Sequence, residues 1–153
     1  RMASVAGGGD DRVVVPYNGA GATNFGGLWW NAPAGSESGW GINFTHQGNT
    51  ICATWFTYHF DGSPLWLSVT ASNTAPGVYA GTLYLTSGPA FDAVPFLPAN
   101  VVLTPVGTAT LTFANGNSAT FAYTITLGTP PVAVTQTKPI TRQIFQAPGT
   151  VCQ

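Results

Sequence analysis

Apolar and polar residues alternate over short runs along most of this chain, and no stretch of useful length keeps the 3.6-residue period of a helix. Such alternation is typical of strands with one buried face. Gly48-Asn49, Asp61-Gly62 and Asn115-Gly116 favour tight hairpin turns. The pattern predicts an all-β fold, an antiparallel meander that forms an up-and-down barrel or, alternatively, a two-sheet sandwich. We predict strands near residues 27–31, 39–46, 50–60, 64–71, 77–86, 100–105, 107–114, 117–126 and 132–145.

The hairpin turns also predict which side chains share a face. If Asp61-Gly62 is a two-residue turn, one face of that hairpin carries Phe56, Tyr58, Leu65, Leu67 and Val69, and the other carries Ala53, Trp55, Thr57, His59, Trp66 and Ser68. If Gly48-Asn49 is also a two-residue turn, the second face gains Trp40, Ile42 and Phe44. Both faces would then be apolar. One belongs to the core, and the other must be covered by the N-terminal segment, a loop, a partner or a ligand.

The first part of the chain differs in composition from the rest. We expect residues 1–26, which are rich in Gly and Ala, to form a flexible tether or arm, and residues 27–153 to form a single β-domain. Val13, Val14 and Val15 begin a β-prone run that could pair with a sheet edge of this chain or of a neighbour and so support self-association. Residues 87–99 contain three prolines and are predicted to form a long connection.

Charged residues make up only 6% of the chain, against roughly 25% in ordinary globular domains, and the net charge is −1. Without a basic stripe, binding to nucleic acid is disfavoured. No apolar run approaches the ~18 residues of a transmembrane segment. Such uncharged surfaces are common on secreted, periplasmic and cell-surface proteins, so we expect an extracytoplasmic location.

Two cysteines, Cys52 and Cys152, lie far apart in the sequence. In an exported protein an even pair favours a disulfide, and the alternative is two unpaired thiols. Together with His46 and His59 they do not have the spacing of a zinc site. We therefore predict a disulfide, no metal site and no cofactor.

Several motifs occur in an order that resembles a module of exported proteobacterial proteins: GLWWN, ESGWGINFTHQG, TWFTYHFDGSPLWL, then NGN-x-ATFAYTI and QTKPITRQIF. The match covers roughly residues 27–146. No activity is established for that module, so the resemblance implies export and a compact β-domain. The opening GLWW is also similar to the Gly-x-Trp start of lipocalins and avidins, which implies a barrel.

All five tryptophans lie between Trp29 and Trp66. Trp40, Trp55 and Trp66 could stack on a flat ligand, or they could pack in the core. In the register above, His59 shares their face and is a candidate ligand contact, although a solvated histidine beside a turn is the alternative.

Cationic side chains alternate with others along the last predicted strand. Gln136, Lys138, Ile140 and Arg142 should therefore point the same way. Arg142 could bind a carboxylate, either Glu37 or that of a ligand. The alternatives are a structural ion pair and a solvated strand edge.

Residues for catalysis are sparse. Glu37 and Asp61 are the only carboxylates of the Trp-rich region, and the turn explains Asp61. Neither a Gly-x-Ser-x-Gly motif nor a Gly-rich phosphate loop occurs. We therefore expect a non-catalytic binding module that uses its aromatic face for a sugar, another ring-bearing small molecule or an apolar protein segment. The alternative is a structural subunit of a surface fibre or adhesive layer, assembled through the N-terminal β-prone segment.

Overall fold

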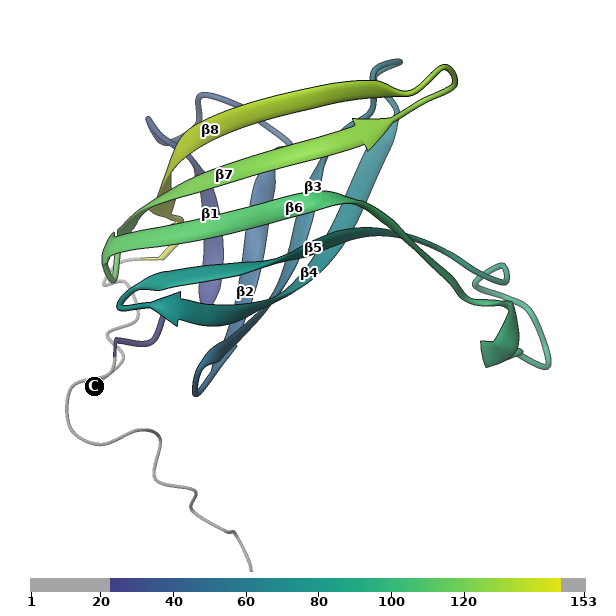
Figure 1. Cartoon of the computed structure of the whole chain (residues 1–153), viewed down its shortest axis with the longest axis horizontal. Coiled ribbons are helices and arrows are strands. Elements are labelled where there is room, and N and C mark those ends of the chain that lie inside the picture. Colours follow the sequence, from purple (N-terminus) through teal and green to yellow (C-terminus); the bar gives the residue numbers. More distant parts are fainter. Residues whose placement is uncertain (1–22, 147–153) are drawn as a thin grey trace, which may run out of the picture.

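The computed structural model describes residues 23–146, which form one closed barrel of antiparallel strands in simple meander order (Figure 1). The barrel prediction is confirmed, and the sandwich alternative is wrong. Two predicted strands, at 100–105 and 107–114, are one long strand. The elements are β1 (Gly27–Asn31), β2 (Gly41–Gln47), β3 (Thr50–Tyr58), β4 (Pro64–Ala75), β5 (Val78–Ser87), the 3₁₀ turn η1 (Pro98–Asn100), β6 (Val102–Asn115), β7 (Ser118–Leu127) and β8 (Val132–Arg142).

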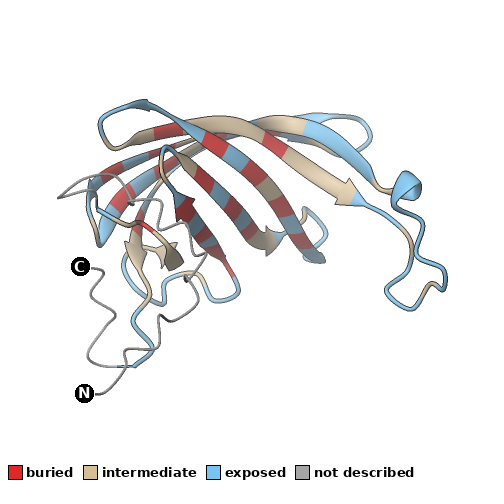
Figure 2. Ribbon diagram, turned by 90° about the horizontal axis from the view of Figure 1, so that it is seen from below, coloured by how far each residue is buried: buried red, intermediate tan, exposed pale blue. Residues whose placement is uncertain are grey.

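The barrel closes where the first strand pairs with the last. Trp29 is opposite Arg142, and Asn31 is opposite Ile140, in an antiparallel ladder between β1 and β8. Closure gives the sheet one interior, so alternate residues of each strand must fill a shared space. The alternation of buried and exposed residues along the strands is visible in Figure 2.

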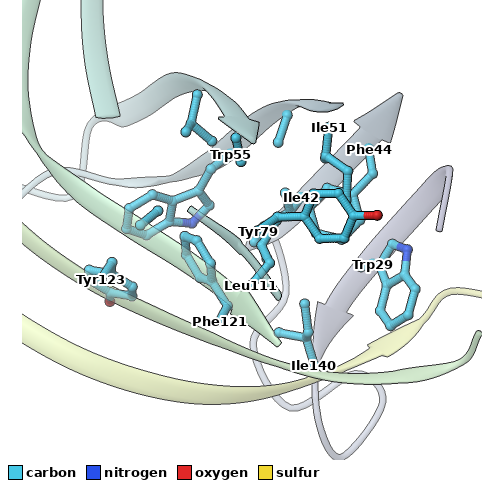
Figure 3. Packing of buried hydrophobic residues seen from close by; sticks show 14 of the residues in the cluster. Trp29, Ile42, Phe44, Ile51, Trp55, Tyr79, Leu111, Phe121, Tyr123 and Ile140 are labelled. Carbon is cyan, nitrogen blue, oxygen red and sulfur yellow. The ribbon is translucent and has the colours of Figure 1, made fainter. Parts of the chain in front are cut away.

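The interior is packed rather than hollow over most of its length (Figure 3). Rings from β1, β2, β3, β5, β6 and β7 meet there with aliphatic side chains. The largest fully buried side chains are Trp29, Phe121, Ile42, Ile51, Leu67, Leu83, Leu111 and Ile140. Because these side chains must be buried, the core determines which side of each strand points into the barrel.

The two ends of the barrel differ. At one end, which we call the Phe25 end, the chain before β1 folds inward and the Phe25 ring stacks on Phe113 with centroids 3.8 Å apart. Phe25 lies within the expected tether of residues 1–26, yet it is buried. At the other end, the mouth, the loops 32–40, 59–63 and 128–131 surround the strand ends. Val13, Val14 and Val15 lie outside the described residues.

The predicted register of the β3–β4 hairpin is wrong by one residue. Phe56 is opposite Trp66, and Trp55 is opposite Leu67. In the described residues no non-glycine residue has a positive φ, so Asp61 cannot take the first position of a two-residue type I′ turn. Instead, the His59 N–H donates to the Ser63 carbonyl, and Gly62, at φ +80°, closes a three-residue loop. The extra residue places Trp66 outside and Leu65 inside the barrel.

The β2–β3 hairpin has the predicted register. Gln47 is opposite Thr50, and Ile42 is opposite Trp55, so Gly48-Asn49 is a two-residue turn. Only Gly48 of this pair has a positive φ, as a type II′ turn requires. Ile42 and Phe44 therefore face Trp55 inside the barrel, as expected.

Glycines in the ESGWG motif make room for aromatic side chains of the TWFTY motif on the outer surface. A Cβ on Gly41 would lie 2.5 Å from the Phe56 ring, and one on Gly39 would overlap the Tyr58 hydroxyl. Gly41 in β2 thus leaves room for the Phe56 ring, and Gly39, in the loop before β2, leaves room for Tyr58. Packing of an aromatic ring over a glycine stabilises the glycine in a sheet. Trp40, between the two glycines, points inward instead and is 6% exposed.

The ribbon of β5 and β6 extends beyond the barrel wall, as Figure 1 shows. A register shift between Leu83 and Tyr84 bends it, and its far part pairs only with itself, Ser87 being opposite Val102. Residues 88–101, which include most of the long connection predicted at 87–99, form its tip. Phe91 and Val94 on the tip are almost fully exposed.

Within residues 23–146 no helix has the length and the apolar character needed to cross a membrane.

Gly107 lets β6 and β7 approach each other closely. A Cβ there would clash with the Thr124 carbonyl oxygen and lie 2.9 Å from Ile125 Cα. We expect Gly107→Ala to lower the free energy of unfolding by about 1–3 kcal/mol, because the backbone must shift. Gly88→Ala, whose Cβ meets nothing nearer than 3.4 Å, should change it by less than about 0.5 kcal/mol. Urea unfolding followed by tryptophan fluorescence measures both, and equal midpoints would contradict the close approach.

Candidate functional site at the barrel mouth

The mouth of the barrel holds a cavity of about 220 Å³ above the packed core. Its walls come from the ends of β3, β4, β7 and β8 and from the loops at 32–40 and 59–63. The lining is mostly apolar, with a few polar groups, as is typical of small-molecule sites. The lining residues are Glu37, Trp40, Trp55, Thr57, Tyr58, His59, Phe60, Leu65, Tyr123, Ile125, Leu127, Val134, Gln136 and Lys138.

An ion pair stands at the edge of this cavity. The Lys138 ammonium lies 2.6 Å from Glu37 Oε1, and the two side chains are 17% and 37% exposed. Lys138 is on β8 among inward-pointing residues, whereas Glu37 is on the loop between β1 and β2. Asn31 Nδ2 also donates to Glu37 Oε1, at 3.1 Å. Lysine is rarely this buried without an opposite charge, so Glu37 stabilises the ammonium inside the barrel.

Two further polar groups lie on the wall beside Lys138. The Tyr123 hydroxyl donates to Gln136 Oε1 across β7 and β8. Burial, and then the nearby Glu37 carboxylate, raise the pKa of Tyr123 above its usual value, so the hydroxyl stays protonated as a donor. Because its oxygen accepts this bond, Gln136 has its amide N–H groups left for other partners.

Trp40 and Trp55 line the cavity but offer little ring surface to it. They are only 6% and 3% exposed. Their rings meet at 62° with centroids 6.2 Å apart, and Trp55 packs edge-to-face on Phe121 at 5.1 Å. In Figure 3 the Trp55 indole nitrogen is on the Phe121 side of its ring. The faces that could stack on a flat ligand are therefore mostly occupied by neighbouring rings.

The other predicted site residues divide between the two sides of the wall. His59 lines the cavity, 3.8 Å from the Asp61 carboxylate. Trp66 does not, because the register shift places it on the outer surface with half of its side chain exposed. The structure thus brings together Trp40, Trp55 and His59, and separates Trp66 from them.

Arg142 lies at the Phe25 end, away from the cavity. Its guanidinium donates to the backbone carbonyls of Gly116, Gly26 and Asn24, and it stacks over the Trp29 ring at 5.0 Å. These contacts hold the segment before β1 against the barrel. The uninterrupted register of β8 gives these alternate residues a common direction, as predicted, and Lys138 rather than Arg142 is the partner of Glu37.

The Cys52 side chain is exposed on β3. Cys152, its predicted disulfide partner, lies outside the described residues. Among residues 23–146, no cluster of three or more His, Cys, Asp or Glu side chains is arranged to hold a metal ion.

His46 is buried at the Phe25 end and holds the inserted segment. Its Nδ1 accepts from the Phe25 backbone N–H at 3.3 Å, and its Nε2 lies 2.8 Å from the Gly48 carbonyl and 3.1 Å from the Tyr79 hydroxyl. Because Nδ1 accepts a bond, the neutral tautomer protonated on Nε2 fits these contacts. Although His46 lies next to the Gly48-Asn49 turn, it is buried, because the Phe25 ring stacks on it.

A second cavity, of about 400 Å³, adjoins His46 at the Phe25 end. Thr23, the first described residue, is one of its lining residues. The mouth cavity has the Lys138–Glu37 ion pair in its lining, which makes it the better candidate for a ligand site.

Comparison with known proteins gives no match to a family model, to a curated protein or to a solved structure. The resemblance to the proteobacterial module stays a prediction.

The position of Trp66 outside the barrel can be tested by fluorescence quenching. It has the largest exposed fraction of the five tryptophans. We expect Trp66→Phe to remove most of the emission that iodide quenches and to shift the remaining emission to shorter wavelength. Trp40→Phe should leave the quenchable fraction in place. A protein whose quenching is unchanged by Trp66→Phe would not have this register.

The stability of the Phe25 end should depend on pH through His46. Burial lowers its pKa below the usual value near 6.5, and the bond with the Gly48 carbonyl only partly offsets this. As pH falls below about 6.5, the unfolded chain therefore takes up a proton more readily than the folded one, and stability decreases. Urea unfolding between pH 7.5 and 5.5 should show this decrease, with a weaker one in His46→Gln. Equal slopes in the two proteins would contradict the neutral, buried imidazole.

Proposed function

We propose that this chain is a non-catalytic binding module of an exported protein, and that its barrel mouth holds a small ring-bearing molecule. The observation that carries the proposal is the set of polar groups that face inward at the mouth: the Lys138–Glu37 ion pair and the Tyr123–Gln136 hydrogen bond. A barrel gains little stability from such groups, since withdrawing charges even partly from water costs free energy that their attraction scarcely offsets. A recognition role accounts for their placement beside an apolar cavity.

The size of the cavity favours a small ligand. At about 220 Å³ it is below the roughly 300–1,000 Å³ typical of sites for drug-sized molecules. A lipid chain or an oligosaccharide would extend out of it. A single ring with one or two polar substituents matches both the volume and the lining of Leu65, Ile125, Leu127 and Val134.

A sugar bound by stacking on tryptophan is a weaker candidate. Such binding needs an open indole face, and the faces of Trp40 and Trp55 are packed against Phe121, Tyr123 and each other. Trp66 has an exposed ring but lies on the outer surface, away from the cavity. The aromatic side chains at the mouth could instead contact the apolar ring of a ligand through their edges.

Titration with small ring compounds tests the proposal. We expect indole and phenol, but not glucose, to shift the amide NMR signals of mouth residues such as Thr57 and Leu127 at millimolar concentrations or below. Thr57→Trp should abolish these shifts by filling the cavity. Thr135→Trp, the same substitution on the outer face of β8, is the matched control and should preserve them.

If no ring compound affects the mouth signals, or if Thr57→Trp binds as well as the unaltered protein, the proposed function is wrong.

A further inference from the structure

We infer that the ligand of the barrel mouth is a small ring-bearing carboxylic acid, whose carboxylate takes the place of Glu37 at the Lys138 ammonium. This inference rests on the proposed function and names its ligand class. It follows from an asymmetry between the two members of the ion pair, from the charge balance of the cavity and from the nature of the surrounding wall.

The two members of the pair differ in how readily they can separate. Lys138 is on a strand of the closed barrel and its side chain is mostly covered, with 17% exposed. Glu37 is on the loop of residues 32–40 and its side chain is 37% exposed. A rotation about its side-chain bonds moves the Glu37 carboxylate into solvent, where it is fully hydrated. The cation is therefore fixed in the wall, and its present counter-ion is replaceable.

Charge balance decides which ligand charge the mouth accepts. If Glu37 leaves and nothing replaces it, a partly buried ammonium loses its counter-ion, which is unfavourable. An entering carboxylate restores the pair, so one anion leaves as another arrives. A cationic ligand would leave Lys138 facing a second positive charge. A neutral ligand has to fit beside the closed pair and gains no ionic contact from it.

The walls fit the rest of such a molecule. Gln136, two residues from Lys138 on the same face of β8, accepts a bond from Tyr123 at its oxygen, so its amide N–H groups can donate to the second carboxylate oxygen. Beyond these donors the wall is apolar, with Leu65, Ile125 and Leu127 among the lining residues. The Lys138 ammonium also lies 5.7 Å from the centre of the Trp40 ring, so the cation is held from two sides.

Matched acids and amides test the inference at pH 7.4, where the acids are ionised. The probes are benzoate and phenylacetate, their amides benzamide and phenylacetamide, and the cation benzylamine, each measured by calorimetry and NMR titration. We expect the acids to bind at least tenfold more tightly than the amides, and benzylamine not to bind. Glu37→Gln should strengthen binding of the acids severalfold, because the competing carboxylate is gone, and leave the amides unchanged.

Two further variants complete the experiment. Asp61→Asn removes a carboxylate from the same end of the barrel without touching Lys138, and it should leave the affinity for the acids unchanged. Lys138→Met keeps the shape of the side chain without its charge and should abolish the preference for acids over amides. If Lys138→Met does not fold, the comparison of Glu37→Gln with Asp61→Asn decides.

The outcomes separate the two proposals. Amides that bind as tightly as the acids, or acids whose affinity does not rise in Glu37→Gln, would overturn the carboxylate inference while leaving the mouth as a binding site. Failure of every probe, acid and amide alike, to reach the mouth in the unaltered protein and in Glu37→Gln would overturn the proposed function and the inference with it.

Discussion

The pairing of β1 with β8 is the constraint on which the rest of this structure depends. It joins the ends of the meander, so the sheet has a single interior that the inward residues of all the strands must fill together. Trp29 and Ile140, on the two strands of this pair, are both fully buried. Arg142 reinforces the pairing of β1 with β8, because it stacks on Trp29 and donates hydrogen bonds to the carbonyls of Gly26 and Asn24, just before β1. Without closure, the apolar inward face would be open to water along its whole length.

The packed interior also explains why the candidate site is at one end. Between Phe25 and the level of Phe121, rings and aliphatic side chains occupy the interior, so the mouth cavity and the cavity beside Phe25 lie at opposite ends of the barrel. At the mouth some of the inward-pointing side chains of β7 and β8 are polar instead of apolar, namely those of Tyr123, Gln136 and Lys138. A site built on strands is held more rigidly than one built on loops. Of the four polar residues Tyr123, Gln136, Lys138 and Glu37, only Glu37 is on a loop.

The fold was more predictable than the site, and the reason is geometric. Alternation and turn dipeptides were enough for the meander and for the Gly48-Asn49 hairpin, because local chemistry determines both. The β3–β4 register depended on whether Asp61-Gly62 closed a loop of two residues or three, and Asp-Gly is compatible with either. That single residue moved Trp66 out of the predicted aromatic face. The alternation of Gln136, Lys138 and Ile140 correctly indicated their common direction. The partner of Lys138 could not be predicted, because Glu37 is 101 residues away and meets it only through barrel closure.

The ends of the described chain lie together at the Phe25 end, where Arg142 contacts both Asn24 and Gly116. The mouth, with its cavity, is at the opposite pole. A label or linker attached directly at Thr23 or Gln146 would therefore be at the pole opposite the cavity. A barrel immobilised at one of these two residues would be held by the Phe25 end, with the mouth, rather than the turn at Gly48, on the side away from the support.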